Sequence, residues 1–212
     1  MKHDPAPMQP SFDDSSTGTE RRSASRVALL IRTAKLISPQ GEFICIVRDA
    51  SATGVSVRLF HTLPVGDQFR LELQSGATYE LHKVWQEGRE AGFEFAEEAD
   101  LAALVDPNGQ FPKRGLRLDI CMPIDIETQR DRRRGVVLNL SQQGARMESE
   151  ALLAIDQAVG LEGLDDRKLR AKVRWRKGLE YGLVFDDTFS LEGFALLAAR
   201  IQCPGLLREP AG

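Results

Sequence analysis

The alternation of apolar and polar residues divides the chain into short segments that are typical of β-strands. Phe69, Leu71 and Leu73 are separated by polar residues, which is the pattern of a strand with one buried face. Other segments are rich in Val and Ile and are bounded by Gly, Asp or Pro. The pattern predicts strands over Arg26–Ile37, Glu42–Arg48, Val55–Phe60, Asp67–Leu73, Tyr79–Trp85 and Ala91–Ala96.

The second half of the chain repeats the first half. A shift of 90 positions superimposes identical residues without a gap, among them ten pairs between Ser51 and Leu191. The pairs are Ser51 and Ser141, Gly54 and Gly144, Leu71 and Leu161, Glu72 and Glu162, Trp85 and Trp175, Gly88 and Gly178, Glu90 and Glu180, Gly92 and Gly182, Phe95 and Phe185, and Leu101 and Leu191. The repeat predicts a duplicated domain in which each copy folds as its own unit.

Six short strands in each copy predict a small closed barrel, because closure removes exposed sheet edges. Each copy ends in a short segment with a helical pattern, Glu97–Leu104 and Leu191–Ile201. Two prolines and a glycine interrupt the chain at Asp106–Lys113. The predicted fold class is therefore mainly β, with two tandem six-stranded β-barrels at residues 20–106 and 107–212, each followed by a short helix. Residues 1–19 lack an apolar pattern and are predicted to be a disordered tail.

Composition and charge exclude several classes of protein. The chain has 212 residues, of which 42% are hydrophobic, and a formal net charge of −3, which argues against a generally basic nucleic-acid binder. No apolar run approaches the ~20 residues of a membrane span, and the first 20 residues lack the apolar region of a signal peptide. The three cysteines, Cys45, Cys121 and Cys203, are far apart, which argues against a disulfide framework or a zinc site. We therefore expect a cytoplasmic protein without DNA, RNA, metal or inserted membrane as partners.

The sequence gives little support for catalysis. The histidines His3, His61 and His82 are not accompanied by the spacings of known hydrolases, metalloproteases or nucleotide-dependent enzymes. Acidic pairs such as Asp165-Asp166 fall in predicted turns, where solvated carboxylates are expected. The prediction is a binding protein and not an enzyme.

Two short motifs in the first copy carry candidate chemistry. Arg22 and Arg26 form the pattern Arg-x-x-x-Arg just before the first strand, and Arg21 precedes them. The second motif, Asp49-x-Ser51-x-x-Gly54, begins 23 residues beyond Arg26 and lies between two predicted strands. Arginine guanidinium groups bind phosphate and the O6 and N7 atoms of guanine in a fork geometry, and aspartate accepts protons from a guanine edge.

These two motifs, at this spacing and on this strand pattern, resemble the PilZ family of bacterial receptors for the second messenger cyclic di-GMP. The resemblance covers about residues 20–104. It implies a six-stranded barrel with a terminal helix, and an arginine arm that closes over the nucleotide. It also implies a signalling role in motility, biofilm or exopolysaccharide output through an unidentified downstream protein. The implied ligand residues are Arg21, Arg22, Arg26, Asp49, Ser51 and Gly54, and no cofactor other than the ligand cyclic di-GMP is implied.

Simpler interpretations of the same residues remain open. The arginines are also compatible with a solvated basic stretch after a tail, and Asp49, Ser51 and Gly54 with a turn that has no ligand. Trp85 either packs inside the barrel or provides a platform on which a guanine stacks. At the level of function, the alternative to a receptor is a protein-interaction adaptor that no longer binds nucleotide.

The second copy carries a degenerate version of the motifs. Asn139, Ser141 and Gly144 take the places of the hexapeptide residues, while Lys113 replaces the first arginine ahead of Arg117. Lysine is a point charge and cannot form a fork, so we expect the first barrel alone to bind nucleotide. In the family, the residue at the position of Arg21 helps to decide whether one nucleotide or a stacked pair is bound, and we expect a pair. A basic cluster is either a solvated hairpin tip or a contact for an acidic partner, and it comprises Arg130, Arg132, Arg133 and Arg134.

Overall fold

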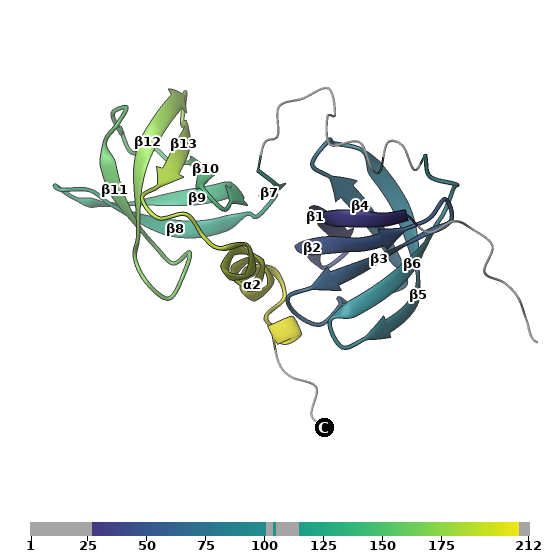
Figure 1. Cartoon of the computed structure of the whole chain (residues 1–212). Coiled ribbons are helices and arrows are strands. Elements are labelled where there is room, and N and C mark those ends of the chain that lie inside the picture. The colour runs from purple at the N-terminus through teal and green to yellow at the C-terminus, as the bar shows by residue number, and fades with distance from the viewer. Residues whose placement is uncertain (1–26, 101–103, 105–114, 208–212) are drawn as a thin grey trace, which may run out of the picture.

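The first half of the chain forms a closed antiparallel barrel. The computed structural model describes residues 27–100, 104 and 115–207 (Figure 1). The ring order of the first barrel is β1-β2-β3-β6-β5-β4, and every expected strand is present within three residues of its expected bounds. The strands are β1 (Val27–Ser38), β2 (Gly41–Ala50), β3 (Gly54–Leu59), β4 (Gln68–Leu73), β5 (Thr78–Glu87) and β6 (Glu90–Phe95).

The second half forms a second closed barrel with the same strand order, β8-β9-β10-β13-β12-β11, and a short extra strand, β7, that pairs with β9. The two-barrel architecture predicted from the repeat is confirmed. The strands are β7 (Arg117–Leu118), β8 (Met122–Glu127), β9 (Arg132–Ser141), β10 (Gly144–Glu148), β11 (Ala158–Glu162), β12 (Leu169–Lys177) and β13 (Glu180–Phe185).

The pairing register confirms the duplication residue by residue. Leu36 pairs with Phe43 in the first barrel, and Ile126 pairs with Arg133, each 90 positions later, in the second barrel. The register of β1 with β2 shifts between Ala28 and Arg32. At the corresponding place in the second barrel the strand is interrupted, so that β7 and β8 together replace β1.

Of the two helices expected from the sequence, the one after the second barrel is present, and the one after the first barrel is not helical over its described first residues. The second barrel is followed by α2 (Leu191–Gln202), capped by the Ser190 side chain, and by the 3₁₀ turn η1 (Pro204–Leu207). The helix expected over 97–104 is wrong at its start, because residues 97–100 are not helical. The Ala99 amide donates to the Ala52 carbonyl (2.9 Å) and so ties this segment to the β2–β3 turn. No helix in the described part of the chain is long and apolar enough to cross a membrane.

Several sequence predictions concern residues outside the described ranges. They are the tail at 1–19, the barrel boundary near residue 106, the arginine segment, and the lysine that replaces an arginine in the second copy. The residues concerned are Arg21, Arg22, Arg26, Lys113 and Arg114.

Helix α2 lies between the two barrels and contacts both (Figure 1). Phe194, Leu197 and neighbouring alanines pack into the core of the second barrel, together with Ile44 from β2 of the first barrel. Phe43 packs against Ala199 of α2 and Leu206 of η1 in a separate small cluster. Burial of such side chains stabilises the fold by about 1.5–3 kcal/mol each. The helix is therefore the apolar link between the barrels.

A buried ion cluster accompanies this apolar link. Lys35 is 6% exposed, and its ammonium lies 3.1 Å from the Glu42 carboxylate and 3.2 Å from the Glu72 carboxylate. Burial alone would lower the pKa of Lys35, but the two carboxylates outweigh it and raise the pKa above its ordinary value. Glu42 also accepts the Asp119 amide (2.8 Å), and its backbone exchanges two hydrogen bonds with the Gln202 side chain. The cluster thus joins β1 and β2 to the second barrel and to α2.

His61 gives a test of this interface. Its ring packs edge-on against Phe43 with the ring centroids 5.1 Å apart, and burial lowers its pKa, helped by Arg89 and opposed by the Thr62 carbonyl. A histidine whose folded pKa is lowered stabilises the protein fully above its unfolded pKa of about 6.5, and loses that contribution as the pH falls below it. We predict that the free energy of unfolding drops less between about pH 7.5 and pH 5.5 in His61→Phe than in the parent protein.

Urea unfolding at the two pH values measures this difference. The matched control is His82→Phe, because His82 is exposed on β5. An equal drop in His61→Phe and in the parent protein would show that His61 does not couple protonation to stability.

Candidate functional site

The β2–β3 turn is held together by Ser51. Its amide donates to the Gly54 carbonyl (2.8 Å), and its hydroxyl accepts from the Gly54 amide (3.1 Å) and from the Thr53 amide (3.3 Å). The turn is further attached to β6, because the Phe95 amide donates to the Thr53 carbonyl (2.9 Å). The serine of the motif therefore has a structural role in shaping the turn.

Gly54 is required for close approach between strands. A Cβ atom at this position would lie 2.6 Å from the Phe93 carbonyl oxygen on β6, a separation that real Cβ atoms do not show. Gly144 has the same relation to the Leu183 carbonyl in the second barrel. Glycine can serve a motif either by adopting a positive φ or by allowing close backbone approach. Gly54 does not have a positive φ, so close approach is the reason that applies here.

A β-bulge places two charged side chains on the outer surface beside the turn. The register of β2 with β3 shifts between Val47 and Asp49, so that Arg48 and Asp49 are both exposed. The Ser56 hydroxyl on β3 donates to the Asp49 carboxylate (3.0 Å), which fixes its orientation. Arg48 was not among the predicted site residues. The one feature of the sequence that could have indicated Arg48 is its position directly before Asp49 of the motif.

Trp85 lies outside the barrel and not in its core. It is 44% exposed on β5, opposite Gly92 on β6, and its indole covers the space that a side chain at position 92 would fill. The interpretation of Trp85 as a core residue is therefore wrong. Trp175 and Gly182 repeat the arrangement in the second barrel.

The motif turn and Trp85 border the same hollow, which has a volume of about 620 Å³. This volume is within the ~300–1,000 Å³ range of ligand pockets. The hollow brings together three predicted site residues, Asp49, Ser51 and Gly54, with Trp85, which is distant in sequence. Its charged lining residues are Arg48, Asp49, Glu90 and Glu94.

The second barrel has a smaller hollow of about 230 Å³ at the equivalent place. Arg117 pairs with Ser141 across β7 and β9, beside Asn139 and Trp175. Two further arginines line this hollow and are paired with carboxylates. They are Arg146, 3.0 Å from Glu180, and Arg174, 3.4 Å from Asp156.

The described residues of the two hollows do not include a set of side chains that could ligate a metal ion. Among residues 27–100, 104 and 115–207, no group of three or more His, Cys, Asp or Glu side chains is placed to hold a metal ion. What the first hollow offers is hydrogen-bonding groups, an exposed indole face and carboxylates, which is a set suited to binding a nucleobase.

The PilZ domain family model matches the chain twice, over residues 20–106 and 111–201. The two matches together cover most of the chain, and it belongs to the PilZ family, which comprises cyclic di-GMP receptors that are binding proteins and not enzymes. A comparison with curated proteins gives no significant match.

Solved structures that resemble this chain at low similarity include the following three proteins. One is the PlzA protein of Borreliella burgdorferi in complex with c-di-GMP, with a TM-score of 0.34 and 14% identity, covering 81% of this chain and 88% of that chain. Another is the inhibitor of motility (MotI/DgrA) of Bacillus subtilis, with a TM-score of 0.33, 13% identity and coverage of 80% and 94%. The third is YcgR from Escherichia coli in complex with c-di-GMP, with a TM-score of 0.27, 11% identity and coverage of 76% and 76%.

The close contact between Trp85 and Gly92 predicts the effect of one methyl group. Gly92→Ala should displace the indole, because an alanine Cβ would overlap its ring. In a Trp175→Phe background, we expect the fluorescence of Trp85 to shift to longer wavelength and to be quenched more strongly by acrylamide. Gly115→Ala is the control, because Gly115 does not have a positive φ and nothing lies within 4 Å of a Cβ at its position. Unchanged fluorescence in Gly92→Ala would contradict the described position of the indole.

Proposed function

We propose that this protein is a cyclic di-GMP receptor whose first barrel binds the nucleotide in the hollow beside the β2–β3 turn. The observation that carries the proposal is the meeting of the Asp49–Gly54 turn with the exposed face of Trp85 around a hollow of ligand size. Gly54 and Trp85 are more than 30 residues apart in the sequence. The turn joins β2 to β3, whereas Trp85 is on β5, and β6 lies between β3 and β5 in the barrel. The carboxylate of Asp49 would accept protons from a guanine edge, and the indole would stack on a base.

The charge of the hollow explains why arginines from outside it are needed. Arg48 is accompanied by three exposed carboxylates, on Asp49, Glu90 and Glu94. A ligand with two phosphates would be repelled by this set unless further cations accompanied it. The arginines of the Arg22-x-x-x-Arg26 motif are proposed to supply them.

The chain entry into the first barrel is consistent with this role. Val27, the first residue of β1, pairs with Ala50 next to the motif turn. Consecutive Cα atoms are about 3.8 Å apart, and an extended chain spans at most ~3.6 Å per residue. Val27 therefore fixes the start of β1 beside the turn, and chain length alone limits the Cα of Arg22 to within roughly 18 Å of the Cα of Val27. Closure of this segment over the nucleotide would change the surface that the receptor presents to a downstream protein.

Calorimetric titration with cyclic di-GMP tests the proposal. Arg22→Ala and Arg26→Ala should each weaken binding by on the order of 1–3 kcal/mol, because each removes a fork-shaped cation. Arg26→Lys should restore little of the loss, since lysine keeps the charge but not the fork. Arg70→Ala is the matched control, because Arg70 is an exposed arginine on β4 that pairs with Glu80 outside the hollow.

The base specificity separates recognition from phosphate attraction. Cyclic di-AMP should bind much more weakly, because adenine carries a donor where guanine carries the O6 acceptor. Equal affinity for the two dinucleotides, or unchanged binding in both arginine variants, would refute the proposed site.

We further predict that the first barrel alone binds nucleotide, as a stacked pair. The full chain should bind about two nucleotides, because three neighbouring guanidinium groups can form fork-shaped contacts with the phosphates and stack against the bases of a pair. Arg22→Ala should weaken the binding of both nucleotides by at least the amount given above, whereas Arg117→Ala, in the second hollow, should leave the stoichiometry and affinity unchanged. Fluorescence in single-tryptophan variants reports the location: the signal of Trp85 should change on binding and that of Trp175 should not. A response from Trp175 would place nucleotide in the second barrel.

A further inference from the structure

The second barrel has an open basic face that the nucleotide site does not involve. A hollow of about 1,100 Å³ lies between the β8–β9 hairpin and the loop that follows β10. Arg130, Arg133 and Arg134 line it from the hairpin side, and Leu152 lines it from the loop. Leu152 is 80% exposed, so most of its apolar side chain is accessible from the hollow side of the loop.

The duplication shows what the same face does in the first barrel. Arg133 and Arg134 occupy the positions of Phe43 and Ile44, 90 residues earlier. The strand pairing agrees with this correspondence. Phe43 pairs with Leu36 and Arg133 with Ile126, while Ile44 pairs with Lys35 and Arg134 with Asp125. Phe43 and Ile44 are fully buried, Phe43 against the end of α2 and η1, and Ile44 within the core that includes α2.

The loop beside this face repeats the relation. Leu152 corresponds to Thr62, 90 positions earlier. Thr62 donates two hydrogen bonds to the Leu206 carbonyl of η1, one from its amide (3.2 Å) and one from its hydroxyl (2.9 Å). In the first barrel, this face is therefore a docking surface for a helical segment. In the second barrel the equivalent face is uncovered in the described structure, and its two buried apolar side chains are replaced by arginines.

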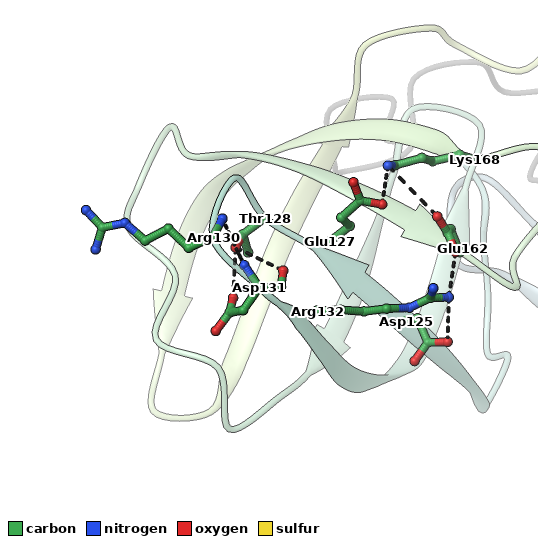
Figure 2. A network of polar contacts seen from close by, with 8 residues as sticks. All are labelled: Asp125, Glu127, Thr128, Arg130, Asp131, Arg132, Glu162 and Lys168. Carbon is green, nitrogen blue, oxygen red and sulfur yellow. Dashed lines mark hydrogen bonds and ion pairs between the residues drawn. The ribbon is translucent and has the colours of Figure 1, made fainter.

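The charges on this face are only partly neutralised. Arg132 forms ion pairs with Asp125 (3.0 Å) and Glu162 (2.5 Å), and Arg133 with Asp131. Within the described ranges, no ion pair involves the side chain of Arg130 or of Arg134. Figure 2 shows the Arg130 guanidinium extending away from the network that holds its neighbours. Two guanidinium groups and a leucine side chain are thus available at one hollow.

We propose that this face binds an acidic protein segment that also carries an apolar side chain. The unpaired arginines would bind its carboxylates through charge-assisted hydrogen bonds, and Leu152 would pack against the apolar residue, because burial of exposed apolar surface is favourable. The proposal does not depend on cyclic di-GMP binding. A nucleic acid is disfavoured, because Asp131 and Glu150 lie among the arginines and would repel a continuous polyphosphate.

The test uses the full chain and a defined probe. The probe is a fluorescein-labelled peptide of about 18 residues, composed of glutamate with leucine at every fourth position. It is an extended chain and not a helix, because like charges four residues apart oppose helix formation. A peptide of the same length without leucine is its control. Fluorescence anisotropy is measured at low and at physiological salt, because exposed charge pairs weaken with screening.

Matched variants decide whether the proposed face carries the binding. Arg130→Glu with Arg134→Glu should weaken binding of the leucine-containing peptide by about tenfold or more. Arg167→Glu with Arg170→Glu makes the same change in charge at exposed positions of the same barrel outside the hollow, and should change affinity by less than about twofold. Leu152→Ser should weaken the leucine-containing peptide and leave the all-glutamate peptide unaffected. Circular dichroism confirms that each variant is folded.

Three results would overturn the proposal. The first is the absence of binding by the parent protein, and the second is an equal loss in the two double variants, which would indicate attraction to net charge alone. The third is tighter binding of a duplex DNA oligonucleotide at the same salt, lost in Arg130→Glu with Arg134→Glu, which would assign the face to nucleic acid.

Discussion

The buried Lys35 ammonium is the constraint on which the arrangement of the two barrels depends. A charge removed from water must be paired and hydrogen-bonded, and loss of one partner of a buried pair costs about 3–5 kcal/mol. Glu42 meets this need and at the same time accepts the Asp119 amide of the second barrel. Gln202 then fixes the backbone of Glu42 from α2. The ion cluster therefore selects one docking arrangement, while the apolar contacts of α2 supply most of the stabilisation.

The second barrel carries the same ion cluster with its charges exchanged. Asp125 stands at the position of Lys35, and Arg132 at that of Glu42, while the third member remains a glutamate, Glu162. Here the central cation is on β9 and is exposed (Figure 2). Both copies therefore keep the ion pairs between neighbouring strands, but the central cation is buried only in the first barrel. The two faces have diverged in what they bind, with the strand pairing beneath them unchanged.

The sequence predicted the strands well and the site only in part, for a physical reason. Alternation of apolar residues is a local signal, and so is the turn chemistry that places Asp49. The position of Trp85 depends on its pairing with Gly92 across β5 and β6, and the exposure of Arg48 on a bulge in β2. The segment after β6 was expected to be helical from Glu97, but a hydrogen bond to a distant turn holds its start in another conformation. Each of these features arises from tertiary contacts that composition and spacing do not contain.

The contact between Glu42 and Gln202 joins residues 160 positions apart, which has a consequence for biosynthesis. All six strands of the first barrel leave the ribosome long before α2 is translated, and domains fold as units from the N-terminus during synthesis. The first barrel therefore closes while Phe43 and Ile44 still lack the cover that α2 and η1 provide. During that interval the nascent chain presents an apolar surface that the finished protein conceals, and a stop in translation before residue 191 would leave it permanently exposed to aggregation and to chaperones.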